Sequence, residues 1–360
     1  MKIAKRFELF YFRYMKLSFY DLTFTDLLEV LHKNQLNSFG AQNLYNWFYK
    51  QKKSYPCKME LSQETKNFLE NRYSFDLPKI HKVIESEDKT VKFLFELNDG
   101  SKVETVLIPF HQKYSICLSS QVGCAMKCSF CFTGTQGLKR NLATSEIVGQ
   151  FIAAWQWLER NRPNEVRILN IVYMGQGEPL HNFDAVKKSC EIFLSKNGTS
   201  IGPKKITIST SGYIPGLKRW KDEIPGVNLA LSLHSTETQK RNELIPINKK
   251  YPLEDVITYI DSIPLSKKQF ITYEYLLIKD FNDSIEDAKK TGELLKGKEA
   301  YINLIPFNPY PGTSYERPTD QKVEDFKKEL QKFKIPALIR TTKGDDVLAA
   351  CGQLNTAQND

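Results

Sequence analysis

The sequence predicts an α/β fold in which parallel strands alternate with helices, joined to a smaller helical domain. Three patterns support this fold class. From Tyr114 onward, short apolar runs alternate with helical patterns; two strand-like runs flank a turn just before that point; and the earlier residues have helical apolar spacing. The 360 residues suffice for one large domain with an attachment, and a content of 41% hydrophobic and 26% charged residues is typical of globular proteins.

Residues 1–85 are predicted to form the small helical domain. Apolar side chains recur at helical spacing over residues 24–31 and 41–48, and basic residues surround them. The basic, aromatic stretch 1–14 matches no motif and adds nothing to this prediction.

Residues 86–110 are predicted to be a connecting β-hairpin. The runs VKFLFEL and KVETVLI flank Asn98, Asp99 and Gly100, which are residue types that tolerate a positive φ in tight turns. We therefore expect paired strands over residues 91–108.

Residues 111–340 are predicted to form a partial (βα)6 barrel resembling a TIM barrel. Helical stretches at 145–160, 185–194 and 285–295 lie between most of the strands, and right-handed crossovers would curl these strands into a barrel or an open part of one. The active site of such a barrel lies at the carboxyl ends of its strands. A helix at 323–333 and a strand at 336–340 lead into the tail, residues 341–360. The six predicted strands span residues 115–118, 168–173, 205–209, 227–233, 270–277 and 301–305.

The charge balance and the cysteine content narrow the function. Lys and Arg exceed Asp and Glu by 51 to 42, which favours an anionic partner such as a nucleic acid, although charge alone fits a protein without such a partner equally well. No apolar run reaches the length of a membrane span, and Glu8 and Arg13 interrupt the N-terminal segment, so we expect a cytoplasmic protein with no membrane partner. In that reducing compartment, seven cysteines indicate metal or redox chemistry rather than structural disulfides.

Three cysteines, Cys124, Cys128 and Cys131, have the spacing CxxxCxxC on the loop after the first predicted barrel strand. Three thiolates can hold a 4Fe-4S cluster and leave one iron free to bind a small molecule. A structural zinc ion requires four protein ligands, so the alternative is a zinc site completed by a distant His or Cys. The odd number of ligands favours the cluster.

This motif, with Gly123 and Phe130 beside it, resembles the radical S-adenosylmethionine superfamily. The resemblance implies a partial barrel of the radical S-adenosylmethionine type and a cofactor whose amino and carboxylate groups chelate the open iron. A second element similar to that superfamily is GQGEP at residues 175–179, after the second predicted strand. Its glycines allow close backbone approach, and Glu178 is expected to accept from the cofactor's ammonium group.

Almost the whole chain, from about residue 17, resembles the RlmN/Cfr-type RNA adenosine methyltransferases. The resemblance implies methylation of adenosine carbon 2 in the peptidyl-transferase region of 23S rRNA, and of the adenosine 3′ of the anticodon in tRNA. Carbon 2 is too electron-poor to attack a sulfonium methyl group directly, which explains the need for radical chemistry. The matching blocks, in order, are ETVLIP, CLSSQVGCAMKCSFCFTGTQGLKRNL, YMGQGEPLHN, ISTSG, LSLHS, NLIPFNPYPG and GDDVLAACGQL.

The resemblance also implies roles for residues outside the cysteine motif. Cys351 falls on the family's methylated cysteine, and Cys117 on the cysteine that releases the RNA through a transient disulfide with it. Glu104 matches the family's proton acceptor, although the Cys117 thiolate remains an alternative acceptor. The cofactor contacts that carry over, each at or just after the end of a predicted strand, are Gly177, Glu178, Ser209, Ser232, Leu233, His234 and Asn308.

The remaining cysteines and the basic residues are predicted from pattern alone. Cys57 and Cys190 match no motif and are expected to be structural. RNA binding is assigned to the N-terminal helices, where Trp47 or Tyr49 would stack on bases, and to basic rims. These rims are the pairs Lys204 with Lys205, Lys240 with Arg241, and Lys249 with Lys250.

Two alternative functions remain open from sequence. A related enzyme of the same type would methylate carbon 8 instead of carbon 2, and a protein of another class would bind RNA through an iron-sulfur cluster without turnover. The predicted partners are 23S rRNA, tRNA and an electron donor such as flavodoxin or ferredoxin, and the predicted oligomeric state is a monomer.

Overall fold

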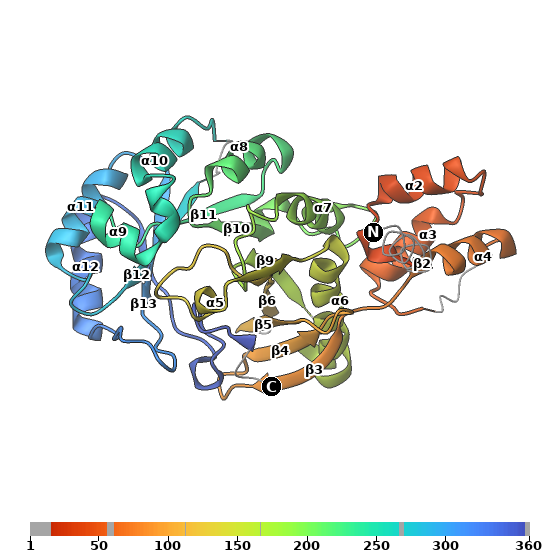
Figure 1. Ribbon diagram of the computed structural model, residues 1–360, viewed down its shortest axis with the longest axis horizontal. Coiled ribbons are helices and arrows are strands. Elements are labelled where there is room, and N and C mark those ends of the chain that lie inside the picture. Colours follow the sequence, from red (N-terminus) through yellow and green to blue (C-terminus); the bar gives the residue numbers. More distant parts are fainter. Residues whose placement is uncertain (1–15, 56–60, 112, 166, 266–269, 357–360) are drawn as a thin grey trace, which may run out of the picture.

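The computed structural model describes residues 16–55, 61–111, 113–165, 167–265 and 270–356. Its helical N-terminal lobe lies at one end of an elongated molecule, beside a larger α/β body (Figure 1). The lobe contains α2 (Phe24–Lys33), α3 (Ala41–Tyr45), continued by a π-helical turn at Asn46–Lys50, and α4 (Gln63–Arg72). The two helices predicted here are confirmed. The short parallel pair β1 (Leu17–Ser18) and β2 (Tyr73–Ser74) was not predicted.

Aromatic side chains form the core of the N-terminal lobe. Phe19, Tyr20, Phe48 and Tyr49 are fully buried, and the Tyr49 hydroxyl donates to the backbone oxygen of Phe19 at 3.1 Å. Tyr49 is therefore unavailable for stacking on RNA, and that prediction is wrong. Trp47 is half-buried and donates its ring N–H to a backbone oxygen, so its role stays a prediction.

The body contains a ten-stranded sheet within the described residues. β3, β4 and β5 are antiparallel, whereas β6 and β9 to β14 run parallel to one another. The predicted hairpin, the six predicted barrel strands and the strand predicted at 336–340, which is β14, are confirmed, so seven strands run parallel in the described part of the chain. β3 was not predicted. The strands, in spatial order, are β14 (Ala337–Ile339), β13 (Ala300–Pro306), β12 (Ile271–Leu277), β11 (Asn228–Ser232), β10 (Ile206–Thr210), β9 (Ile168–Tyr173), β6 (Lys113–Cys117), β5 (Lys102–Phe110), β4 (Val91–Glu96) and β3 (Lys79–Glu85).

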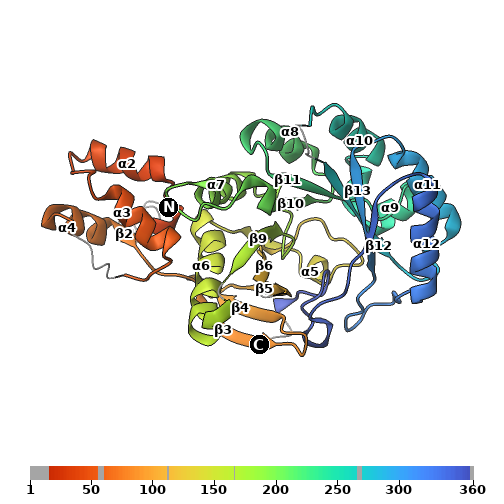
Figure 2. The ribbon, with the colours of Figure 1, turned by 180° about the vertical axis from the view of Figure 1, so that it is seen from behind.

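Helices cover the outer face of the curved sheet, as the view from behind shows (Figure 2). The predicted helices at 145–160, 185–194, 285–295 and 323–333 are present, while three further crossover helices were missed. None of the helices in the described ranges is both long and apolar enough to cross a bilayer. The helices of the body are α5 (Phe132–Thr135), α6 (Thr144–Asn161), α7 (Phe183–Leu194), α8 (Ile214–Glu223), α9 (Thr238–Leu244), α10 (Leu253–Asp261), α11 (Ile285–Leu295) and α12 (Asp320–Lys332).

The sheet forms an open barrel, with β3 and β14 as its two edges. β3 lies within the segment predicted as the helical domain, yet it pairs with β4 in the large sheet. After β14, the tail crosses to the turn between β3 and β4, where Asp346 accepts from the Ser86 hydroxyl at 2.6 Å. The tail thus bridges the two edges of the barrel. Cys57 and residues 1–14 lie outside the described residues, and the proposed domain boundaries remain predictions.

Candidate active site

The loop that carries Cys124, Cys128 and Cys131 is held between two short paired strands. β7 (Gln121–Gly123) and β8 (Leu138–Asn141) are antiparallel, and the Cys124 backbone N–H donates to Gly137 O at 3.0 Å. Gly123 has φ +73°, and a Cβ placed there would lie 1.8 Å from that same Gly137 oxygen. Glycine is therefore required at the start of the loop.

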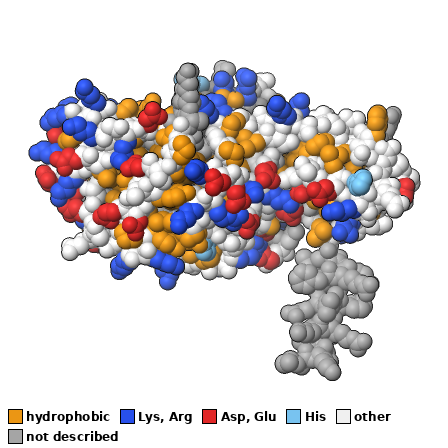
Figure 3. Space-filling model, turned by 90° about the horizontal axis from the view of Figure 1, so that it is seen from above, with side chains coloured by type: hydrophobic (Ala, Val, Ile, Leu, Met, Phe, Trp, Pro, Cys, Tyr) orange, Lys and Arg blue, Asp and Glu red, His pale blue; other side chains and the backbone are white. Residues whose placement is uncertain are grey.

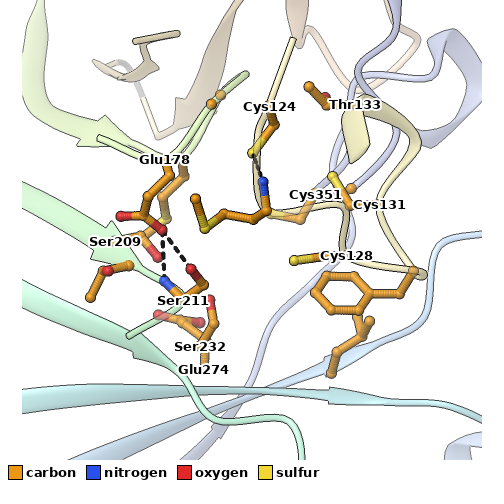
Figure 4. Close-up of a pocket in the computed structure, with 18 of the residues that line it drawn as sticks. Cys124, Cys128, Cys131, Thr133, Glu178, Ser209, Ser211, Ser232, Glu274 and Cys351 are labelled. Carbon is orange, nitrogen blue, oxygen red and sulfur yellow. Dashed lines mark hydrogen bonds between the residues drawn. The ribbon is translucent and has the colours of Figure 1, made fainter. Parts of the chain in front are cut away.

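The three thiols line one pocket that opens to solvent at the carboxyl ends of the strands. In Figure 4 they lie on one side of the pocket, opposite Glu178 and Ser209. Burial raises the pKa of the Cys124 thiol to about 12, so a bound cation is needed to stabilise the thiolate form. The sequence motif is thus brought to the place where a barrel ligand binds.

The donor set fits a cluster better than a zinc ion. Zinc requires four ligand atoms at about 2.0–2.3 Å from one point. A cubane, in contrast, takes separate thiolates at separate corners, and the pocket offers three thiols with open space beside them.

Glu178 is buried, at 3% exposure, and its orientation is set by donors from the neighbouring strand end. One carboxylate oxygen accepts from both the backbone N–H and the hydroxyl of Ser211, each at 2.8 Å, and the other accepts from Leu180 N at 3.2 Å. Burial raises the pKa of Glu178, and the Ser211 hydrogen bonds oppose that shift. A buried carboxylate in this position can bind an ammonium group.

The other predicted cofactor contacts divide into two groups. Gly177, Ser209, Ser232 and His234 line the pocket, whereas Leu233 is fully buried and does not line it. The His234 ring accepts from Leu276 N through Nδ1 at 3.0 Å, and burial lowers its pKa to about 3. The ring is therefore neutral, with its proton on Nε2.

Arg241 holds the strand-end loops together, and its predicted place in a basic rim is wrong. Its side chain is fully buried, which excludes the predicted role in a basic RNA-binding rim. The guanidinium donates to Leu233 O at 3.1 Å, Ser232 O at 2.9 Å and Ser211 O at 3.1 Å. Those carbonyls come from loops around the cofactor contacts, so Arg241 shapes the pocket. Nothing in the charged stretch TQKRNEL marks Arg241 as a buried residue of the site. Ser211, in contrast, lies inside the ISTSG block, so that motif could have revealed it.

Cys117 and Cys351 both line a second cavity, which shares Cys131 and Cys351 with the first. Cys117 ends β6 and is 8% exposed; Cys351 lies in the tail, and its exposed surface faces the two cavities. Loss of hydration inside the cavities raises the pKa of both thiols, to about 12 for Cys117, and the positive charge of Arg340 lowers both. Arg340 lines both cavities and was not predicted.

Hydrogen bonds from the body hold the tail in this position. Asn308 donates to Cys351 O at 3.2 Å, and the Phe132 backbone N–H donates to Gly352 O at 2.7 Å. The Gln353 amide of the tail donates to Pro309 O of the body at 2.8 Å, and also to Asp345 within the tail at 2.7 Å. Asn308, predicted as a cofactor contact, lines the second cavity and binds the tail, and its cofactor role remains a prediction.

Glu104 is fully buried on β5 and lines neither of these two cavities. Its carboxylate forms an ion pair with Lys92 Nζ on β4, at 3.2 Å. Burial raises the pKa of Glu104, while Lys92 and a backbone hydrogen bond from Asn355 in the tail lower it. The predicted proton acceptor thus lies beneath the tail that carries Cys351.

Known proteins match this arrangement over most of the chain. The model of the Radical SAM superfamily matches residues 118–292. The dual-specificity RNA methyltransferase RlmN of Bdellovibrio bacteriovorus is 40% identical over 342 residues, covering 95% of this chain and 84% of that protein. The chain belongs to the RlmN family. Its Aliarcobacter butzleri relative of the same name is 41% identical over 354 residues, covering 94% of this chain and 96% of that protein.

A solved structure supports the RlmN fold. The crystal structure of a radical SAM methyltransferase from Sphaerobacter thermophilus has a TM-score of 0.87 and 35% identity, and the match covers 94% of this chain and 99% of that one. The α/β partial barrel is therefore confirmed. As an RlmN-family member, the chain is an S-adenosylmethionine-dependent RNA methyltransferase, and its cofactors are a 4Fe-4S cluster and S-adenosylmethionine.

Proposed function

We propose that this chain methylates carbon 2 of adenosine in 23S rRNA, in the peptidyl-transferase region, and of the adenosine 3′ of the anticodon in tRNA, through a methyl group carried on Cys351. The observation that carries the proposal is the shared lining of the two cavities. Cys131 lines both, Cys351 lines both, and Cys117 lines the second. The names of the curated relatives, dual-specificity RNA methyltransferases, support the two classes of RNA.

In this proposal Cys124, Cys128 and Cys131 hold the cluster, and Glu178 binds the ammonium group of S-adenosylmethionine. When bound, these cofactors supply the methyl group and an organic radical that removes a hydrogen atom. Ser209, Ser232 and His234 line the same pocket and would orient the rest of the cofactor. The neutral His234 can donate from Nε2, because Nδ1 already accepts from Leu276 N at 3.0 Å.

The remaining residues act on the methyl group and the RNA. The sulfur of Cys351 receives the methyl group; the methyl carbon then loses a hydrogen atom to the organic radical and adds to adenine carbon 2, which leaves one unpaired electron on the purine. A base, Glu104 or the Cys117 thiolate, takes the proton from carbon 2, the electron pair of that C–H bond stays with the purine, and the unpaired electron would return to the cluster that supplied it. Cys117 sulfur then attacks Cys351 sulfur: a disulfide forms, the bond from sulfur to carbon breaks, and its electron pair takes up a proton to leave a methyl group.

The RNA-binding surface remains part of the proposal. Lys204, Lys205, Lys249 and Lys250 are exposed, as predicted for basic rims, while Lys240 pairs with Asp287 at 2.7 Å. On the face in Figure 3, Lys and Arg side chains are interspersed with Asp and Glu. We propose a cytoplasmic monomer that receives electrons from a flavodoxin or ferredoxin; the RNA substrates of the relatives support the location.

Nucleosides from a deletion strain test this function. Mass spectrometry of rRNA and tRNA from that strain should show loss of 2-methyladenosine, and a plasmid copy should restore it. Loss of 8-methyladenosine instead would establish the carbon 8 alternative. Persistence of 2-methyladenosine in both RNA classes would refute the substrate assignment. Formation of 5′-deoxyadenosine by the reconstituted protein with dithionite excludes the non-catalytic alternative.

A further inference from the structure

A buried ion pair contacts the tail on both sides of Cys351. Lys92 Nζ lies 3.2 Å from a Glu104 carboxylate oxygen and donates to Leu348 O, also at 3.2 Å. Glu104 receives the backbone hydrogen bond of Asn355. The two members of the pair thus bind the tail before and after the methyl-carrying residue.

Both side chains are almost completely removed from water, at 2% exposure for Lys92 and 0% for Glu104. Ionising a carboxyl group in such a place requires an opposite charge within contact distance. The charge that faces the Glu104 carboxylate is the ammonium group of Lys92, on β4. The tail contributes the Asn355 backbone, and the loop after β9 contributes Gln176, whose side chain accepts from Glu104 N at 3.0 Å; neither group titrates.

We propose that Lys92 is a positioning residue that keeps Glu104 ionised for proton removal from adenine carbon 2. Through its bond to Leu348 O, Lys92 also links this ionised state to the position of the tail. The inference rests on the proposed function, specifically on Glu104 as the base. In this step the Glu104 carboxylate takes the proton, the C–H bond breaks, and its electron pair stays in the purine ring. Because Glu104 is covered by the tail, the base reaches substrate when the tail shifts, and the same shift breaks the bond from Lys92 to Leu348 O.

Lys92→Met removes the charge while keeping an unbranched side chain. The sign of the effect follows from the pair: losing the Lys92 charge raises the pKa of Glu104, so a higher pH is needed for its ionised form. The acidic limb of the pH profile for RNA methylation should move upward by about 1–3 pH units. Lys92→Arg, which keeps the charge, should leave the limb near its wild-type position.

The experiment uses the full chain with reconstituted cluster, S-adenosylmethionine, dithionite and a 23S rRNA fragment. In single turnovers of Lys92→Met, the ratio of 2-methyladenosine to S-methylated Cys351 should fall at neutral pH, because methyl transfer to sulfur needs no proton from carbon 2. RNA deuterated at carbon 2 should show a larger isotope effect than with wild type. Lys82→Met is the matched control, since Lys82 is exposed on the adjacent β3.

The outcomes separate the inference from the function on which it rests. If Glu104→Gln still methylates RNA, then Glu104 is not the base: the role of Lys92 is overturned, and the proposed function stands with the Cys117 thiolate as the base. If Glu104→Gln abolishes RNA methylation while Lys92→Met keeps the wild-type pH profile, the role of Lys92 is overturned. Should Lys92→Met not fold, Lys92→Gln supplies the same neutral test with a hydrogen-bond donor. Failure of Met, Gln and Arg variants alike to fold would make Lys92 a structural residue and also overturn the proposal.

Discussion

Cys117, at the end of β6, and Cys351, in the tail, line the same cavity although 233 residues lie between them in the sequence. Each thiol is free in the structure. A cavity that contains both lets one sulfur attack the other without refolding of the barrel.

Replacing Cys117 with alanine should trap RNA on the protein. Without the second thiol, the bond from Cys351 sulfur to the transferred carbon has no attacking group, so a covalent adduct accumulates. Denaturing gels and mass spectrometry of protein purified from cells measure it. Cys190→Ala is the control, because Cys190 is buried against Tyr173, outside both cavities. RNA-free Cys117→Ala protein with methylated Cys351 would contradict this role.

Gly123→Ala should prevent cluster assembly. The added Cβ would lie 1.8 Å from Gly137 O, which forces the β7–β8 pair apart and moves Cys124. Gly100→Ala is matched, since its φ of +77° is similar but nothing lies within 4 Å of the new Cβ. That control should cost about 1–2 kcal/mol of unfolding free energy and retain full iron content. Normal iron and sulfide in Gly123→Ala would disprove the explanation.

Arg241→Met should weaken both the fold and the cofactor site. It leaves the Leu233, Ser232 and Ser211 carbonyls without their buried donor. We expect the free energy of unfolding in urea to fall by about 3 kcal/mol or more, together with the affinity for S-adenosylmethionine. Arg219→Met, which breaks surface ion pairs on α8, should cost about 1 kcal/mol or less. Equal losses in the two variants would be inconsistent with this account.

His234 should make stability depend on pH in the acidic range. Burial lowers its folded-state pKa to about 3 from 6.5, so the unfolded chain binds the proton first. The contribution of the neutral ring is fully present above pH 6.5 and is lost as the pH falls toward 3, amounting to about 2 kcal/mol by pH 5. Urea unfolding of wild type and His234→Gln at several pH values measures it. The variant should lose less stability than wild type across this window; parallel curves would refute the assignment.

Gln353→Ala should release the tail without damaging the cluster. The Gln353 side chain is 1% exposed, donates to Pro309 O and Asp345, and accepts from Ala350 N at 3.0 Å. We expect less methylated Cys351 and faster hydrogen exchange over residues 345–356, with unchanged iron content. Gln321→Ala, at an exposed position of α12, is the control. Undiminished Cys351 methylation would show that this anchor is dispensable.

Patterns local in sequence predicted much of this molecule. The cysteine spacing, the GQGEP turn and the apolar runs of β9 and β12 depend on neighbouring residues, so they are visible in the chain. β3 escaped because an edge strand with one exposed face reads as the charged run KIHKVIE. The role of Arg241 could not be predicted, because its partners lie on loops that are separated along the chain. The role of Lys92 could not be predicted either, because its partners, Glu104 and Leu348, are brought together only by the fold.

The tail joins the two edges of the open sheet, from β14 to the turn after β3, through contacts such as Ser86 with Asp346 and Gly344 with Asp88. In the proposed reaction this same bridge carries the methyl group. One displacement of the tail would then both admit a nucleotide between the two sheet edges and deliver the one-carbon unit. A small molecule that fixes the tail to the β3–β4 turn would therefore inhibit the enzyme without binding in the S-adenosylmethionine pocket. Such an inhibitor would not compete with a cofactor that many other enzymes share.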